Sequence, residues 1–186
     1  MISRASGQII RESLNGVGLP APFVNLLLIP LSQPGKILDD PDSADWPQLV
    51  GAVAAAVHAS ESAASRVAAA VEVFLAALDV LDEIEDGDSS PLVEQAGLPL
   101  ALNASTALLF ISQSILAGLP NDGTVASDRS EIMSALATLG ISATAGQHRD
   151  LSQPSELTPT LAEALDISRA KSGSLTGGAC RLAALL

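Results

Sequence analysis

The apolar residues of this chain recur three and four positions apart, which is the spacing of packed helices. The clearest case is the segment 61–86, where one face carries the following apolar side chains: Val67, Val71, Phe74, Leu75, Leu78 and Leu81. Runs of β-branched residues that alternate with polar ones are scarce, so little strand is expected. The pattern therefore predicts an all-α fold, an antiparallel helix bundle around a central cavity.

Proline and glycine divide the rest of the chain into further helices. These are expected over residues 3–17, 23–31, 48–59, 96–116, 130–150 and 158–186, with loops over 32–46, 87–91 and 119–127. Asp128 followed by Glu131 resembles a capping box at the start of one helix. Thr158 and Pro159 are expected to be the N-cap and first residue of the last helix. The glycine pair 177–178 is expected to loosen or kink that helix.

Length and composition limit the classes of function. With 186 residues, the chain is expected to form one domain, 1–186. Its 21 acidic and 9 basic residues give a net charge of −12. That charge excludes a general nucleic-acid binder, because neutralising phosphates needs clustered Lys and Arg. Aromatic residues make up only 2% and tyrosine is absent, so no stacking platform for single strands is available.

The sequence also bears on location. The apolar runs 21–31 and 49–57 are shorter than the roughly 20 residues that span a bilayer. The first residues lack the apolar core of a signal peptide. The single cysteine, Cys180, excludes an internal disulfide framework. A cytoplasmic protein without a transmembrane segment is therefore expected.

The candidate chemistry lies at the end of the segment 61–86. One helix face there carries an acidic stripe, which consists of Asp79, Asp82, Glu83 and Asp86. Like charges at this spacing cost roughly 0.2–0.5 kcal/mol per pair, and acidic groups near a helix C-terminus also oppose the helix dipole. No Lys or Arg occurs between Arg66 and Arg129, so no partner nearby in sequence neutralises the stripe.

Two interpretations of the acidic stripe remain open. A hard divalent cation such as Mg²⁺ would neutralise it through Asp82 and Asp86, which are one helical turn apart. Alternatively, the stripe is a solvated helix end of an acidic protein. Glu85 lies about 100° round the helix from Asp86 and is expected to face solvent or a neighbouring helix.

Five segments, in order, resemble motifs of the trans-polyprenyl diphosphate synthase family. The segment 72–86, EVFLAALDVLDEIED, is similar to the helix whose DD-I-x-D pattern holds Mg²⁺ on an allylic diphosphate in that family. The other similar segments are PGK at 34–36, GLPLALNASTALL at 97–109, GQHRDL at 146–151 and KSGSL at 171–175. The resemblance covers most of the chain and implies the helix bundle of isoprenoid synthases.

The resemblance also implies a cofactor and site residues. The cofactor would be Mg²⁺, with the metal-binding carboxylates Asp79, Asp82, Glu83 and Asp86. The substrate-binding residues would be Lys36, Gln147, Asp150 and Lys171, of which Gln147 and Lys171 would also be catalytic. From the residues alone, Lys171 could equally be a surface lysine, and Gln147 and Asp150 could merely satisfy each other on their shared helix face.

The sequence departs from the family pattern at several positions. Asp39 and Leu75 stand where the family has the Arg and His that grip the diphosphate of isopentenyl diphosphate. Asp88 begins the segment that replaces an Arg-Arg-Gly. The family's second aspartate-rich motif lies tens of residues beyond the K-T-G segment, whereas only the residues up to Leu186 follow Lys171. Either the chain is a fragment, or its site is half built, or another subunit completes it. The bundle is expected to be incomplete at its C-terminal end and to pair as a homodimer or heterodimer.

Two functions are compatible with these observations. The first is a prenyltransferase that binds an allylic prenyl diphosphate through Mg²⁺ and ionises it for transfer to an acceptor other than isopentenyl diphosphate. The second is a catalytically weak or silent helical subunit that regulates a full-length prenyl diphosphate synthase. The acidic stripe and Lys171 favour the first, and the missing arginines favour the second.

Overall fold

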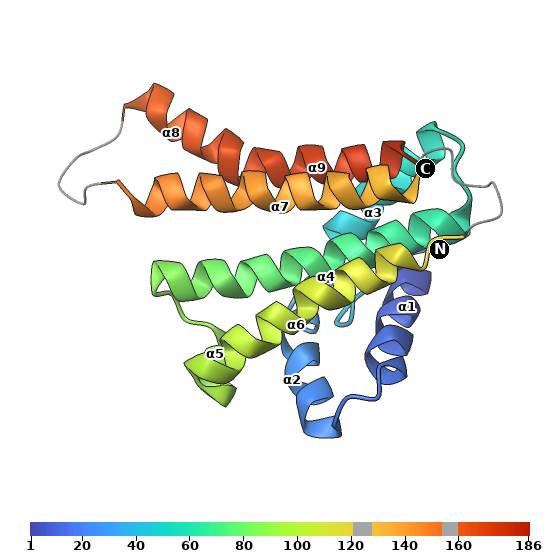
Figure 1. The fold of residues 1–186 in the computed structure, drawn as a ribbon, viewed down its shortest axis with the longest axis horizontal. Coiled ribbons are helices and arrows are strands. Elements are labelled where there is room, and N and C mark those ends of the chain that lie inside the picture. The colour runs from blue at the N-terminus through green and yellow to red at the C-terminus, as the bar shows by residue number, and fades with distance from the viewer. Residues whose placement is uncertain (121–127, 154–159) are drawn as a thin grey trace.

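The computed structural model describes residues 1–120, 128–153 and 160–186, and within them every regular element is helical. The predicted all-α class is therefore confirmed. The elements are α1 (Ile2–Gly16), α2 (Ala21–Leu31), α3 (Asp45–Ala56), α4 (Glu61–Asp86), α5 (Pro91–Ala96), α6 (Leu98–Ala117), α7 (Arg129–Leu151), α8 (Leu161–Ser168), the π-helical η1 (Arg169–Gly173) and α9 (Ser174–Ala184). Figure 1 shows α4 and α6 running antiparallel, with α7 and α9 forming a second antiparallel pair beside α4.

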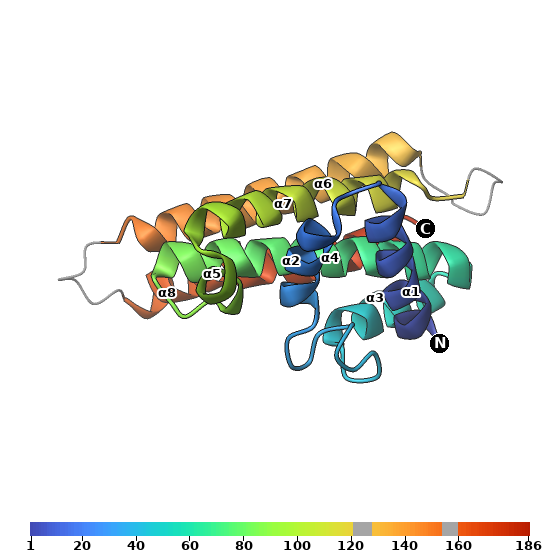
Figure 2. The ribbon, with the colours of Figure 1, turned by 90° about the horizontal axis from the view of Figure 1, so that it is seen from below.

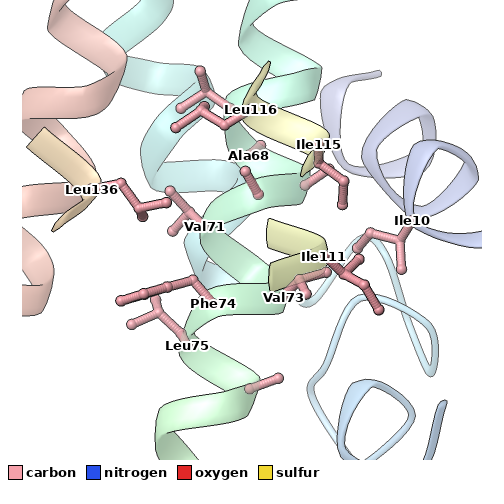
Figure 3. Packing of buried hydrophobic residues seen from close by; sticks show 14 of the residues in the cluster. Ile10, Ala68, Val71, Val73, Phe74, Leu75, Ile111, Ile115, Leu116 and Leu136 are labelled. Atoms are coloured by element: carbon pink, nitrogen blue, oxygen red, sulfur yellow. The ribbon is translucent and has the colours of Figure 1, made fainter. Parts of the chain in front are cut away.

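The central element is α4, which is buried along most of its length. The Ser60 hydroxyl caps its N-terminus by accepting from the Ala63 amide, and Gly87 ends it with a positive φ of 73°. The many alanines of α4 let neighbouring helices approach closely, and α1, α3, α6, α7 and α9 all contact it. Figure 3 shows Val71 near Leu136 of α7, while side chains from α6 lie on the other side of α4. The acidic end of α4 is therefore held by packing on several faces.

Several predicted boundaries differ from the structure. The segment 91–96 forms α5, although Pro91 was expected in a loop and residues 92–95 were assigned to no element. Pro91 suits the first turn of a helix, and Gly97 ends it with a φ of 80°. Helix α3 begins at Asp45 and so includes Asp45 and Trp46, which were expected in the loop 32–46. Asp128 caps α7 as predicted, but its side chain accepts from the Ser130 amide rather than forming the reciprocal box with Glu131.

The expected last helix consists of three parts. Helix α8 begins with a capping box between Thr160 and Glu163, whereas the predicted starting pair, Thr158 and Pro159, lies outside the described residues. The π-helical turn η1 then joins α8 to α9. The predicted weakness at glycines 177–178 is wrong, because α9 runs through them without interruption. The irregular turn lies earlier and carries Lys171.

By length and composition alone, α6 could cross a membrane, and it is the one such helix in residues 1–120, 128–153 and 160–186. This apolar character of 98–117 was not predicted from the sequence. The side chains of α6 that face α4, such as Ala104, Leu108 and Ile111, are buried in the core, as in the core helix of a bundle. The two chain termini lie towards the same end of the bundle, away from α5 and the acidic end of α4 (Figure 2).

Candidate active site

One lysine meets three carboxylates where α4, α7 and η1 come together. The Lys171 ammonium lies 2.8 Å from Asp82 Oδ1, 3.5 Å from Asp86 Oδ2 and 3.5 Å from Asp150 Oδ2. Asp82 and Asp86 are one turn apart at the end of α4, and Asp150 lies near the end of α7. Three carboxylate oxygens therefore converge on one cationic atom.

Gln147 links α7 to the same carboxylates. Its Nε2 donates a 3.0 Å hydrogen bond to Asp86 Oδ1. Its Oε1 is buried and has no hydrogen-bond partner in the part of the chain that the structure describes, and the residue is only 7% exposed. A buried amide oxygen without a partner costs free energy, so this atom is available to a bound donor or to positive charge.

The second lysine lies on another side of α4. Lys36 Nζ donates to Asp79 Oδ2 at 2.5 Å, which ties the loop before α3 to the acidic end of α4. The next amide, of Ile37, donates a 3.2 Å hydrogen bond to Oε1 of the buried Glu72. Asp39, which stands where the family has an arginine, accepts from the Gly35 amide at 3.3 Å and shapes this loop.

Burial and charge shift two pKa values in this region. Burial raises the pKa of Glu72 above its ordinary value, against the opposing Ile37 hydrogen bond and Lys36 charge. Burial alone would lower the pKa of Lys171. The hydrogen bond that Lys171 donates to Asp82, together with the charges of Asp82, Asp86 and Asp150, outweighs the effect of burial, so the pKa of Lys171 is raised. Lys171 is therefore a stable cation at neutral pH.

A cavity of about 200 Å³ opens beside this cluster. Its polar wall carries Lys171, Gln147 and Asp82, and its apolar wall is formed by Leu78, Leu81, Ala143 and Leu175. Asp79, Glu85, Thr144 and Ser172 complete the lining. The cavity thus joins a charged end to an apolar end, which suits an amphiphilic ligand.

The predicted metal ligands do not all meet. Asp82 and Asp86 share Lys171, whereas Glu83 lines a separate cavity of about 80 Å³, together with Lys36 and Asp79. Asp79 lines both cavities. Glu85 is exposed, as expected, but it also lines the larger cavity.

A divalent cation fits the carboxylates on chemical grounds. Within the described ranges, no three His, Cys, Asp or Glu side chains are arranged as a ready metal cluster. The position where carboxylate oxygens converge is instead taken by the Lys171 ammonium. Carboxylate oxygens are the donors that Mg²⁺ prefers, so Asp82 and Asp86 could hold it once Lys171 moves to another partner.

The predicted substrate-binding residues fall into two groups. Gln147 and Lys171 line the larger cavity, and Asp150 contacts Lys171 beside it. Lys36 lies on the other side of α4 with Asp79. Leu78 was predicted only as part of the apolar face of 61–86, and Ala143 and Leu175 were not singled out, because their helical spacing is that of any core residue. The pairing of the two lysines with the acidic stripe was likewise not predicted.

Comparison with known proteins places the fold. The polyprenyl synthetase family matches residues 46–186. A geranyltransferase from Legionella pneumophila is similar in structure, with a TM-score of 0.81 and 19% identity over 99% of this chain and 65% of its own. An FPP/GFPP synthase from Zymomonas mobilis has a TM-score of 0.79 and 22% identity, covering 100% of this chain and 69% of its own.

A geranylgeranyl pyrophosphate synthetase from the archaeon Geoglobus acetivorans is also similar. Its TM-score is 0.79 at 23% identity, over 99% of this chain and 58% of its own. The chain therefore spans 58–69% of the length of these three structures. A comparison with the curated proteins found no match.

Proposed function

Because the chain belongs to the polyprenyl synthetase family, we propose that it binds an allylic prenyl diphosphate in the larger cavity and ionises it for transfer to an acceptor. The observation that carries this proposal is the convergence of Asp82, Asp86 and Asp150 on the Lys171 ammonium at the charged end of an apolar cavity. A prenyl diphosphate has the same division between a charged head and an apolar tail.

The charged end would bind the diphosphate. Asp82 and Asp86 would hold Mg²⁺, which when bound neutralises the charge that develops on the leaving diphosphate. Lys171, released from these carboxylates, would donate to a diphosphate oxygen as a point charge. In the free protein the three carboxylates raise the pKa of Lys171, so the side chain that meets the diphosphate starts as a cation.

The rest of the cavity would protect the reacting carbon. Leu78, Ala143 and Leu175 would hold the first part of the prenyl tail and exclude water from the allylic cation. Gln147 would direct Oε1 towards the positive charge of the allylic cation, while its Nε2 donates to Asp86. This arrangement favours cleavage of the C–O bond without hydrolysis of the cation.

The acceptor would be a molecule other than isopentenyl diphosphate. The smaller cavity, where Lys36 lies, contains Asp79 and Glu83, so its carboxylates outnumber its one ammonium. Asp39 and Leu75 stand where an arginine and a histidine would have gripped a second diphosphate. This side of α4 is therefore poorly suited to a dianionic head group.

A regulatory subunit is the second candidate function. Helix α6 exposes Leu98, Leu102 and Phe110, which are 47%, 40% and 66% exposed. Apolar side chains on one exposed helix support association with a second copy or with a full-length synthase. A location in the cytoplasm remains a prediction under either function.

Release of diphosphate separates the two candidates. The purified chain would be incubated with geranyl or farnesyl diphosphate and Mg²⁺, and free diphosphate measured over time. We expect Mg²⁺-dependent release by the wild type and at least tenfold less by Asp82→Asn, about the effect of one charged interaction in the transition state. Absence of release from both substrates would favour the regulatory subunit.

A further inference from the structure

Gly146 of α7 lies against the backbone of η1. A Cβ atom added at Gly146 would lie 2.5 Å from the carbonyl carbon of Ala170 and 2.5 Å from the amide nitrogen of Lys171. It would also lie 2.8 Å from the Ala170 carbonyl oxygen. All three atoms belong to the main chain, so no side-chain rotation can relieve the contact. Only a glycine permits this approach of the two segments.

From this contact we infer that Gly146 is a positioning residue for Lys171. The segment that it touches carries Lys171 in a π-helical turn, a rare form that is frequent at functional sites. Gly146 also directly precedes Gln147 and lies one turn before Asp150, the two α7 residues of the same cluster. The close approach therefore sets the distance between the ammonium and the carboxylates.

Gly146→Ala tests this inference. The new Cβ is expected to push η1 away from α7 and to draw the Lys171 ammonium from Asp82, Asp86 and Asp150. The chain has only two lysines, so acetylation by acetic anhydride can be followed at each by peptide mass spectrometry. We expect acetylation of Lys171 to become several-fold faster, while that of Lys36 stays unchanged. This measurement needs no ligand and is independent of the proposed function.

A second measurement rests on the proposed function. Calorimetric titration with a non-hydrolysable farnesyl diphosphate analogue in Mg²⁺ should show about tenfold weaker binding in Gly146→Ala, the loss of one charge-assisted hydrogen bond. In a Lys171→Met background, Gly146→Ala should cause no further loss, because Gly146 acts through Lys171. If the wild type does not bind the analogue, the proposed function fails and the acetylation rates still decide the role of Gly146.

Gly177→Ala is the matched control. It adds the same methyl group to the neighbouring helix α9, where an added Cβ meets nothing within 4 Å. In Gly177→Ala, the rate of Lys171 acetylation and the affinity for the farnesyl diphosphate analogue should equal those of the wild type. Equal acetylation of Lys171 in Gly146→Ala and Gly177→Ala would overturn the inference, as would a further loss of binding in the Lys171→Met background.

A second variant covers the case in which Gly146→Ala does not fold. Ala170→Gly, added to Gly146→Ala, gives η1 the backbone freedom to move away from the new methyl group. We expect this double variant to fold and to acetylate Lys171 several-fold faster than Ala170→Gly alone. Unfolding of both variants would overturn the inference, because Gly146 would then serve the whole fold rather than the position of Lys171.

Discussion

Lys171→Met separates two roles of one side chain. In the free protein, the Lys171 ammonium is the cation that neutralises Asp82, Asp86 and Asp150. With substrate bound, the same ammonium would contact the diphosphate. Methionine has a similar length and carries no charge, so the variant removes both interactions while filling much of the same space.

The structure sets the size of the first effect. The side chains of Lys171, Asp82, Asp86 and Asp150 are 24%, 38%, 32% and 44% exposed, so each ion pair is partly screened by solvent. Pairs of this kind contribute at most about 1 kcal/mol each. Three pairs share one ammonium, so we expect Lys171→Met to lower the free energy of unfolding by about 1–2 kcal/mol in the absence of metal.

Lys171→Met should strengthen the binding of Mg²⁺ alone and weaken the binding of the diphosphate. Without the competing ammonium, the carboxylates are free to bind a divalent cation, so Mg²⁺ alone should raise the melting temperature of Lys171→Met more than that of the wild type. The diphosphate loses a charge-assisted hydrogen bond, so its affinity in Mg²⁺ should fall about tenfold. The melting temperature in Mg²⁺ measures the first effect, and the melting temperature in Mg²⁺ plus the farnesyl diphosphate analogue measures the second.

Lys36→Met provides the comparison. Lys36 contacts Asp79 on the other side of α4, so its removal should change the Mg²⁺ effect less than removal of Lys171. The reasoning is refuted if Mg²⁺ alone shifts the wild type and Lys171→Met equally. It is also refuted if the two lysine variants lose the same diphosphate affinity.

Three further predictions concern stability and association. Burial raises the pKa of Glu72, so the unfolded chain loses the Glu72 proton at a lower pH than the folded chain does. The free energy of unfolding of the wild type should therefore fall as the pH rises from about 4.3, the ordinary value, through the higher pKa of the folded state. Glu72→Gln should abolish that fall, as urea unfolding between pH 4 and 7 would show. Gly87→Ala should cost about 1 kcal/mol in urea unfolding, since Gly87 ends α4 with a φ of 73°. Phe110→Ser should lower self-association in sedimentation velocity, and a monomeric wild type would contradict this.

The helices of this chain are largely predictable because their signals are local. The 3.6-residue period over 61–86, Ser60 before it and Gly87 after it determine α4 without reference to the rest of the fold. Helix α5 was missed because six residues carry too little periodicity to be recognised. The π-helical turn η1 was also missed. It lies where the backbone at Ala170 approaches Gly146, and no local sequence pattern encodes such a tertiary contact.

The candidate site was predictable in its residue types but not in its pairing. The absence of Lys and Arg between Arg66 and Arg129 excluded only a partner that is close in sequence. The fold supplies two partners from far away, Lys36 to Asp79 and Lys171 to Asp82. Such contacts arise from tertiary packing and cannot be derived from spacing along one helix. Glu83 was placed in the stripe by that spacing, yet it lines the other cavity.

The most direct test is calorimetric titration of the chain with the farnesyl diphosphate analogue in Mg²⁺, comparing Asp82→Asn with Asp88→Asn. Both variants remove one negative charge near the end of α4, but Asp88 is exposed beyond Gly87, whereas Asp82 contacts Lys171. We predict that the wild type and Asp88→Asn bind alike, and that Asp82→Asn binds at least about tenfold more weakly. Equal affinity in all three proteins would contradict the assignment of this cavity as the prenyl diphosphate site.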